Sequence, residues 1–191
     1  MKEAITRAFE ESIQAKRAFL KENLSTLMSA IDAVAEAFLR GNKFLIFGNG
    51  GSAADAQHIA AEFVNRFRIE RPPLPALALT TDTSAITSIA NDYDYKEIFS
   101  KQVKALGKEG DVALAISTSG NAANVLAAIE VCKKLKIATI GLTGGDGGKM
   151  ARQVDYLLRV SEGKNTARIQ ETHILVGHVI CELVDQKLFS A

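Results

Sequence analysis

Two residues that can bind a metal or transfer protons stand four positions apart in one helix-forming run. His58 and Glu62 lie within the segment 53–65, AADAQHIAAEFVN. Residues four apart share one face of a helix, so this imidazole and this carboxylate would point the same way. Such a pair suits general acid–base chemistry or metal binding. It is equally compatible with an ordinary exposed ion pair, so the neighbouring segments have to decide between these readings.

A glycine-rich turn directly before this helix predicts an anion site. The apolar run Phe44–Phe47 has strand character and is followed by Gly48-Asn49-Gly50-Gly51-Ser52, where we expect Ser52 to cap the helix. A turn of this kind presents backbone N–H groups and the positive end of a helix dipole to a ligand, most often a phosphate. Its position next to His58 and Glu62 favours a functional role for that pair.

A second turn of the same type follows another apolar run. Ser117-Thr118-Ser119-Gly120-Asn121 comes after Val112–Ile116 and leads into a helix, so it offers hydroxyls and N–H groups to an anion. In a flavodoxin-like sheet the first and third strands are neighbours at the place where ligands bind. The strand order is open at this point, but that order would bring the two turns side by side.

Other polar residues are weaker candidates for the functional site. His178 lies in the apolar helical run HILVGHVICELV, where a single histidine is more often a buried core residue than a ligand. On helical geometry, Glu171 shares a face with His178 more closely than Gln170 does. His173 points elsewhere and is interpreted as structural or interfacial. The pair Asn91-Asp92 ends a short helix, either as a simple cap or as a functional pair.

Two glycine motifs fit known nucleotide sites only in part. Gly48–Ala53 matches the dinucleotide pattern G-x-G-x-x-A, but the acidic residue that should follow the second strand, Asp82, lies too far along the chain. The run 144–149, GGDGGK, lacks the first glycine and the final Ser/Thr of a P-loop, because Thr143 and Met150 occupy those positions. We therefore expect no NAD site and interpret 144–149 as a surface turn.

From residue 43 onward, short apolar strands alternate with helices. This alternation predicts an α/β protein with a five-stranded parallel sheet covered on both faces, a three-layer α-β-α sandwich. We expect one domain over 1–191, with an N-terminal helical pair in 1–41 and an α/β core in 42–191. The predicted strands are 44–47, 76–79, 112–116, 138–142 and 156–160, and the predicted core helices are 52–66, 83–91, 97–106, 121–134 and 166–188.

The N-terminal pair comprises amphipathic helices at 3–22 and about 25–39, separated by the interruption at Asn23 and Ser25. No strand precedes these helices or lies between them. They either cover the core of the same chain or pack against another subunit. Both readings stay open from the residues alone.

Composition narrows the class of protein. The 23 Lys and Arg balance 22 Asp and Glu, so no net charge argues for nucleic acid or an anionic membrane as a partner. No apolar run approaches the roughly 20 residues of a membrane span, and the N-terminus lacks an apolar signal core. Cys132 and Cys181 are expected to be reduced core thiols, and the location to be cytoplasmic.

Six segments together resemble one known family. GNGGSAADAQHIAAEF, RPPLPA, IANDY, ISTSGNAANV, LTGGDGGKM and ARIQETHILVGH follow one another over nearly the whole chain. They resemble the sugar isomerase (SIS) domain family, and within it the phosphoheptose isomerases. The resemblance implies a flavodoxin-like sandwich with N-terminal helices, and a homotetramer with active sites between subunits. It also implies interconversion of sedoheptulose 7-phosphate and D-glycero-D-manno-heptose 7-phosphate, the entry step to the heptose of bacterial lipopolysaccharide.

The same resemblance implies roles for individual residues. One Zn²⁺ per subunit would be held by His58, Glu62, Gln170 and His178, which places Gln170 ahead of Glu171 in spite of the helical geometry. One position departs from the family, which often has serine where this chain has Ala122; the lost hydroxyl is worth about 0.5–1.5 kcal/mol if it made a neutral hydrogen bond. The implied substrate contacts are Asn49, Gly50, Gly51, Ser52, Glu62, Asn91, Asp92, Ser117, Thr118, Ser119 and Gln170.

The implied chemistry agrees with the residue types. Aldose–ketose isomerisation moves a proton between adjacent carbons through an enediol, which requires a base at the carbon and an acid near the oxygen. The hypothesis is that Glu62 transfers the carbon-bound proton and that His178 handles the oxygen proton or ring opening. Full ligation of both side chains by zinc would reduce this freedom, and the sequence leaves that tension open.

Two alternatives come from other classes of protein. Some SIS proteins do not isomerise sugars, among them a tetramer that binds the bacterial replication initiator protein, and the chain is similar to these in ITRAFEESIQAK and in its C-terminal helix. A regulatory module that binds phosphosugars without turnover is the other alternative. The presence of both Glu62 and His178 favours the enzyme.

Overall fold

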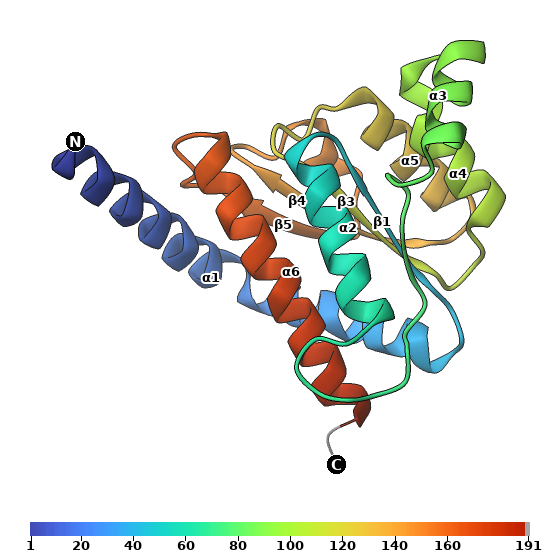
Figure 1. The fold of residues 1–191 in the computed structure, drawn as a ribbon, viewed down its shortest axis with the longest axis horizontal. Coiled ribbons are helices and arrows are strands. Elements are labelled where there is room, and N and C mark those ends of the chain that lie inside the picture. Colours follow the sequence, from blue (N-terminus) through green and yellow to red (C-terminus); the bar gives the residue numbers. More distant parts are fainter. Residues whose placement is uncertain (190–191) are drawn as a thin grey trace.

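The computed structural model describes residues 1–189, and it contains one parallel five-stranded sheet between two layers of helices (Figure 1). The strand order is β2-β1-β3-β4-β5, the flavodoxin-like order, and every neighbouring pair is parallel. The elements are α1 (Lys2–Leu39), β1 (Phe44–Gly48), α2 (Gly51–Val64), β2 (Ala76–Ala78), α3 (Thr83–Asp92), η1 (Tyr95–Glu97), α4 (Ile98–Leu106), β3 (Val112–Ser117), α5 (Ala123–Lys134), β4 (Ala138–Gly144), η2 (Gly148–Arg152), β5 (Tyr156–Val160) and α6 (Thr166–Phe189).

The sheet is buried on both faces because its central strands are almost entirely apolar. All residues of β1 and β3 are buried. Phe44 and Ile46 face one core, which is completed by α1, α2 and α6, whereas Leu45 and Phe47 face a second core completed by α4 and α5. Continuous apolar strands of this kind are typical of parallel sheets. The predicted three-layer sandwich with five strands is therefore confirmed.

The prediction of two N-terminal helices is wrong. α1 is a single helix of 38 residues that passes through Asn23 and Ser25 without a break. Asn23 is buried, and its side-chain amide donates to the carbonyl of Phe19 and to that of Arg159 in β5, while its oxygen accepts from the Arg159 amide. A tertiary partner thus satisfies a side chain that would otherwise compete with the helix backbone. The N-terminal part of α1 extends away from the sheet (Figure 1).

The two polar turns meet at the same end of the sheet. β1 and β3 are neighbours, with Gly48 opposite Ile116, so the segments that follow them emerge side by side. This confirms the adjacency that the flavodoxin-like order predicts. The expected cap is wrong, however, because α2 begins at Gly51 with Gly50 as its N-cap, and Ser52 lies buried within the first turn.

Neither cysteine takes part in a disulfide. Cys132 and Cys181 are both free and buried, as predicted. Burial raises the pKa of the Cys132 thiol to about 12 and also raises that of Cys181, so both remain thiols at neutral pH. Among residues 1–189, no helix combines the length and apolar character needed to cross a membrane.

Candidate functional site

Helices α2 and α6 lie side by side, and their close approach builds the candidate site (Figure 1). Gly177 in α6 permits it, since a Cβ atom there would lie 2.5 Å from Cδ1 of Ile59 in α2. Nearer the start of both helices, a Cβ atom on Gly51 would lie 2.3 Å from Nε2 of Gln170. The two helices therefore run in register, and Gln170 rests on the first turn of α2.

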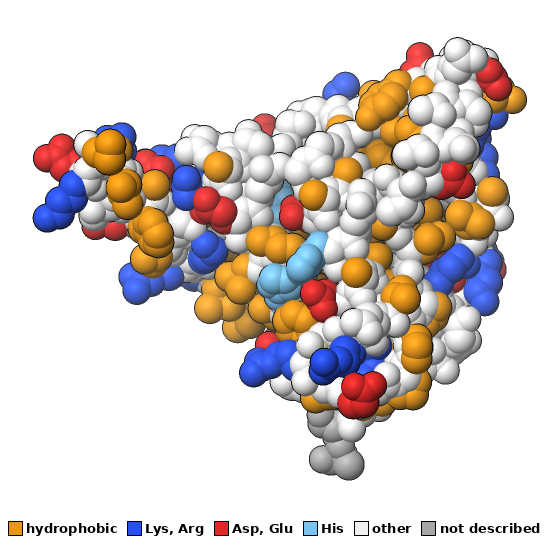
Figure 2. Space-filling model, in the orientation of Figure 1, with side chains coloured by type: hydrophobic (Ala, Val, Ile, Leu, Met, Phe, Trp, Pro, Cys, Tyr) orange, Lys and Arg blue, Asp and Glu red, His pale blue; other side chains and the backbone are white. Residues whose placement is uncertain are grey.

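This register brings three of the predicted metal ligands together. Nε2 of His58 lies 2.8 Å from Nε2 of His178 and 3.3 Å from Oε1 of Glu62. One potential ligand atom from each of the three residues falls within 4.8 Å of the others. The His178 ring also stacks on Phe67, with ring centroids 5.5 Å apart and an angle of 24° between the planes. Histidine side chains are visible at the surface near the centre of this face (Figure 2).

The donor set fits a divalent metal ion. Two imidazoles and a carboxylate are ligands that zinc accepts, with metal–ligand distances of about 2.0–2.2 Å. Tetrahedral geometry at such distances separates neighbouring ligand atoms by about 3.3 Å, which is close to the 2.8 and 3.3 Å between the His58, His178 and Glu62 atoms. The amide of Gln170 lies about two helical turns before His178 in α6, against Gly51 at the start of α2. The geometry thus brings three of the four predicted ligands together and leaves Gln170 about two helical turns away from His178.

A half-buried carboxyl lies beside this group. Asp55 precedes His58 by three residues in α2, and its Oδ2 atom is buried without a hydrogen-bond partner among residues 1–189. Burial raises the pKa of the Asp55 carboxyl, and the nearby His58 opposes that shift. Sequence reasoning missed this residue, although an acid one turn from a histidine on a helix is a visible signal.

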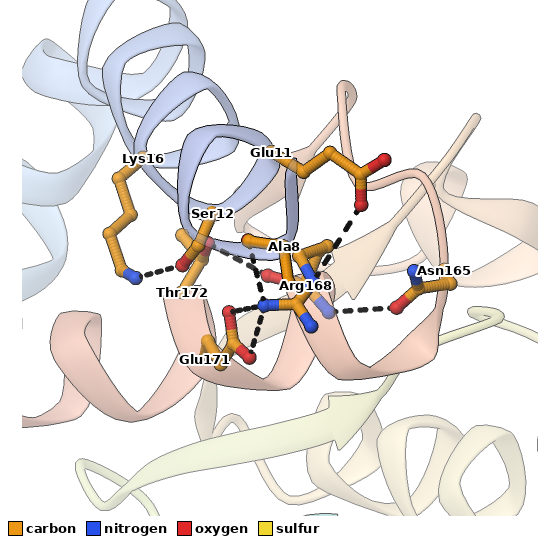
Figure 3. A network of polar contacts seen from close by, with 8 residues as sticks. All are labelled: Ala8, Glu11, Ser12, Lys16, Asn165, Arg168, Glu171 and Thr172. Carbon is orange, nitrogen blue, oxygen red and sulfur yellow. Dashed lines mark hydrogen bonds and ion pairs between the residues drawn. The ribbon is translucent and has the colours of Figure 1, made fainter. Parts of the chain in front are cut away.

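The first turn of α6 is fixed to α1 by a polar network (Figure 3). Nη1 of Arg168 donates to both carboxylate oxygens of Glu171, at 2.6 and 2.8 Å, and to the carbonyl of Ala8 in α1 at 3.1 Å. Asn165 accepts from the Arg168 amide and caps the helix. Because Glu171 is engaged on the α1 side, Gln170 is the side chain that faces α2. The structure thus distinguishes Gln170, which faces α2, from Glu171, which is bound on the α1 side.

The glycine-rich turn is held by an amide pair. The side chains of Asn49 and Asn124 exchange two hydrogen bonds of 2.9 Å, and Asn49 Oδ1 also accepts from the Tyr95 hydroxyl at 3.2 Å. Asn124 is buried in the first turn of α5, so it joins the turn after β1 to the helix after β3. Gly50 and Gly51 remain exposed at the start of α2. Sequence reasoning missed Asn124 because its partner lies in a different turn.

The second turn carries the predicted hydroxyl groups. Ser117 is buried at the end of β3, Thr118 is half-buried and Ser119 is exposed. The Ser119 hydroxyl accepts from the Asn121 amide at 3.2 Å. Ala122 is the N-cap of α5, and no side-chain cap is made there. The departure from serine at this position therefore removes a helix cap as well as a hydroxyl.

Asn91 and Asp92 stand apart from these contacts in the single chain. They end α3, both are exposed, and the Asn91 amide donates to the Asp92 carboxylate at 2.8 Å. No hydrogen bond or ion pair within residues 1–189 joins them to the other predicted site residues. His173 is also separate, since it is buried and contacts the carbonyl of Thr143, as expected for a structural residue.

The fold and the site define the class of protein. In an open α/β sheet, ligands bind at the carboxyl ends of the strands at the switch point, which is where the two polar turns lie. The family model of the SIS domain matches residues 8–144. The chain therefore belongs to the SIS domain family, and within it to the phosphoheptose isomerases, on the basis of the following relatives.

The similarity to phosphoheptose isomerases covers nearly the full chain. The protein of that name from Thermodesulfovibrio yellowstonii is 53% identical over 99% of this chain and 94% of its own length. The one from Aneurinibacillus thermoaerophilus is 52% identical over 99% of this chain and 96% of its own. The solved structure of the Neisseria gonorrhoeae enzyme superimposes with a TM-score of 0.91 at 46% identity, covering 97% of this chain and 98% of that one. The Francisella tularensis structure gives 0.92 at 42% identity, covering 96% and 97%.

Proposed function

We propose that this protein is an aldose–ketose isomerase that interconverts sedoheptulose 7-phosphate and D-glycero-D-manno-heptose 7-phosphate, for lipopolysaccharide heptose synthesis. The observation that carries the proposal is the convergence of His58, Glu62 and His178 where α2 and α6 meet. The names of the relatives identify the substrate class, and the site supplies an acid, a base and an anion cradle for it. Relatives named as isomerases, together with this equipment, disfavour the non-catalytic alternative.

The proposed reaction is a pair of proton transfers. Starting from the ketose, Glu62 removes a proton from C1 while His178 donates a proton to the C2 carbonyl oxygen, which gives the enediol. Glu62 then returns the proton to C2, and the O1 hydroxyl gives its proton to His178 as the aldehyde forms. No atom is lost, and both residues return to their starting states. Glu62 Oε1 faces His58, and the second carboxylate oxygen can carry the proton.

We assign the phosphate to the two turns at the end of β1 and β3. Backbone N–H groups at a helix start attract an anion, and hydroxyl groups add hydrogen bonds. Asn91 and Asp92 are proposed as additional substrate contacts, on the resemblance alone. The proposed substrate-binding residues are Asn49, Gly50, Gly51, Ser52, Glu62, Asn91, Asp92, Ser117, Thr118, Ser119 and Gln170.

We propose one Zn²⁺ per subunit, held by His58, Glu62, Gln170 and His178. The support is the fit of three ligand atoms, from His58, Glu62 and His178, to a tetrahedral ion. Gln170 is included on the resemblance alone. Bound zinc would supply Lewis-acid polarisation of the sugar oxygens at this site. With Nε2 of His178 and one oxygen of Glu62 on the ion, the protons would be carried by Nδ1 of His178 and by the other oxygen of Glu62.

We propose a homotetramer with active sites at the subunit interfaces. The support is a row of exposed apolar side chains along α1, visible on the projecting helix in Figure 2, because soluble monomers rarely expose such a continuous apolar face. Replacing Phe9 and Leu24 by glutamate should lower the mass measured by light scattering, and an unchanged tetramer would contradict this use of α1. The row comprises Ile5, Phe9, Ile13, Leu20, Leu24 and Met28.

We further infer that residues 1–191 form one SIS domain and that the protein is cytoplasmic. The side-by-side packing of α1 and α6 and their shared core support a single unit. Two free, buried thiols are typical of a reducing compartment.

The function is tested by direct turnover. Purified protein is incubated with sedoheptulose 7-phosphate, with and without added zinc, and the aldose product is followed by NMR. Formation of D-glycero-D-manno-heptose 7-phosphate supports the proposal, and the zinc comparison reports what the metal contributes. Binding of the sugar without any product, in folded and zinc-supplied protein, would assign the chain to the binding or sensor class instead.

A further inference from the structure

Glu62 occupies a part of its helix that is intrinsically weak. It lies in the last turn of α2, which ends at Val64. The final four carbonyl groups of a helix have no donor within the helix, and helix ends open more readily than helix centres. A residue that must hold one position for chemistry therefore requires an external support at this point. The helix offers none of its own, because its C-cap is Asn65 rather than a glycine.

One guanidinium provides that support. Nη2 of Arg71 donates to the carbonyl of Glu62 itself at 2.8 Å, and Nη1 donates to the carbonyls of Phe63 and Asn65 at 2.7 and 3.1 Å. The positive charge also lies at the negative end of the α2 dipole, which is a favourable position. Arg71 therefore acts as the C-terminal cap of the helix that carries Glu62.

The same guanidinium ties α2 to the helix that carries His178. Nε of Arg71 donates to Oδ1 of Asp185 at 3.0 Å, and the two side chains are only 1% and 4% exposed. Asp185 follows His178 by seven residues in α6, two helical turns, so both face α2. The Arg71–Asp185 pair thus lies alongside the His58–Glu62–His178 group and connects the same two helices.

The loop around Arg71 suits this task. Arg71 precedes Pro72 and Pro73, and a residue before proline has a restricted backbone. The loop returns to α2 through a further hydrogen bond, from the Leu74 amide to the carbonyl of Phe63 at 3.0 Å. The planar fork of arginine can satisfy several acceptors at once, which the point charge of a lysine cannot do.

We propose that Arg71 is a positioning residue for the isomerase: it fixes the last turn of α2 against α6 and thereby holds Glu62 at the distance from His58 and His178 that metal binding and proton transfer require. The inference rests on the proposed function of this site. It adds to that proposal a residue that touches neither the sugar nor the ion. Its effect reaches the site only through the backbone of Glu62 and the register of α2 with α6.

The first test is the conservative variant Arg71→Lys, which keeps the charge beside Asp185 but loses most of the carbonyl contacts. Outer-shell changes around metal sites typically cost about 10- to 100-fold in affinity or activity. We expect zinc affinity, measured by competition with a chromogenic chelator, and kcat each to fall by about 10-fold. KM should change by less than about 3-fold, because the phosphate turns lie at the other end of α2.

A double variant separates positioning from folding. Replacing a buried ion pair by apolar residues is often neutral for stability, so Arg71→Met with Asp185→Leu should fold while lacking every guanidinium contact to α2. The control is Lys43→Met, which removes the 2.6 Å ion pair with the buried Asp111 at the opposite end of the sheet. The control should lose stability but keep the zinc affinity and kcat of the wild type.

The outcomes distinguish the two claims. Arg71→Lys and the double variant with wild-type zinc affinity and kcat would overturn the positioning role, as would an equal loss in Lys43→Met. If the double variant does not fold, Arg71→Lys alone decides. Wild-type protein that neither binds zinc nor forms product would overturn the proposed function, and the inference with it.

Discussion

Nε2 of His58 and Nε2 of His178 lie 2.8 Å apart, although 120 residues separate them in the chain. Their meeting depends on the parallel packing of α2 and α6, which Gly177 permits. Two imidazole nitrogens directed at each other, with a carboxylate oxygen 3.3 Å from one of them, form a site in which a cation would satisfy all three lone pairs. This relationship underlies the proposed metal site.

The close approach of His58 and His178 predicts that zinc binding depends on the His58 imidazole. His58→Gln should weaken zinc binding by more than the roughly 10- to 100-fold that outer-shell changes cost, since a ligand itself is lost. Chelator competition measures the affinity, and thermal unfolding checks that the variant is folded. Gln57→Ala, on the adjacent exposed position of α2, is the matched control and should bind zinc normally. Equal affinities for His58→Gln and the wild type would exclude His58 as a ligand.

Replacing Ala122 by serine is expected to stabilise the folded protein. Ala122 is the N-cap of α5, with an extended backbone and no side-chain cap. Serine at an N-cap stabilises a helix by about 1 kcal/mol relative to alanine, so Ala122→Ser should raise the free energy of unfolding by that amount in urea titrations. The added hydroxyl should also tighten binding of the phosphorylated sugar. A variant no more stable than the wild type would show that the turn cannot place a serine hydroxyl on the α5 amides.

Because His173 is buried, the folded protein is expected to lose stability in acid. Complete burial lowers the pKa of His173 from 6.5 to about 4, while the bond to the Thr143 carbonyl opposes this shift. Below pH 6.5 the unfolded chain therefore binds a proton that the folded chain does not, and stability falls as the pH decreases toward 4. The full interval corresponds to about 3 kcal/mol. Urea titrations between pH 7 and 4 measure this slope, and His173→Gln should reduce it. An identical slope in the variant would assign the acid sensitivity to other groups.

Replacing Asn124 is expected to weaken substrate binding more than it slows the chemical step. Asn124→Ala leaves the Asn49 amide without its reciprocal partner in the glycine-rich turn. A neutral hydrogen bond contributes about 0.5–1.5 kcal/mol, which corresponds to roughly 2- to 12-fold in affinity. We expect KM for the sugar phosphate to rise by this factor and kcat to change less. A fall in kcat with constant KM would contradict the positioning of the turn by Asn124.

Much of the sheet could be predicted because strand character is local. The apolar runs in β1, β3 and β4 are bounded by turns, so their positions follow from composition alone. The predicted helix break at Asn23 was wrong because the backbone groups of Arg159, which hydrogen-bond to the Asn23 side chain, lie in a strand 136 residues away. Local propensity cannot include a partner that only the fold supplies.

The site residues likewise include some that could be predicted from local spacing and others whose roles depend on the fold. His58 and Glu62 could be paired from their spacing, because four residues make one helical turn. The approach of His178 depends on the register of α6 against α2, and that register depends on packing at Gly177. Phe67, Asn124 and Arg71 were missed for the same reason, since each acquires its role only from a residue that the fold brings beside it.

The most direct test of the account is the turnover of Glu62→Gln. The substitution keeps the size and hydrogen-bonding capacity of the side chain but removes the base that should carry the carbon-bound proton. Product formation from sedoheptulose 7-phosphate is followed by NMR for the wild type, Glu62→Gln and the control Glu130→Gln, which alters an exposed residue of α5. We predict product with the wild type and the control and none above background with Glu62→Gln, while all three remain folded. Undiminished turnover by Glu62→Gln would contradict the account, because the proton transfer would then require a different base.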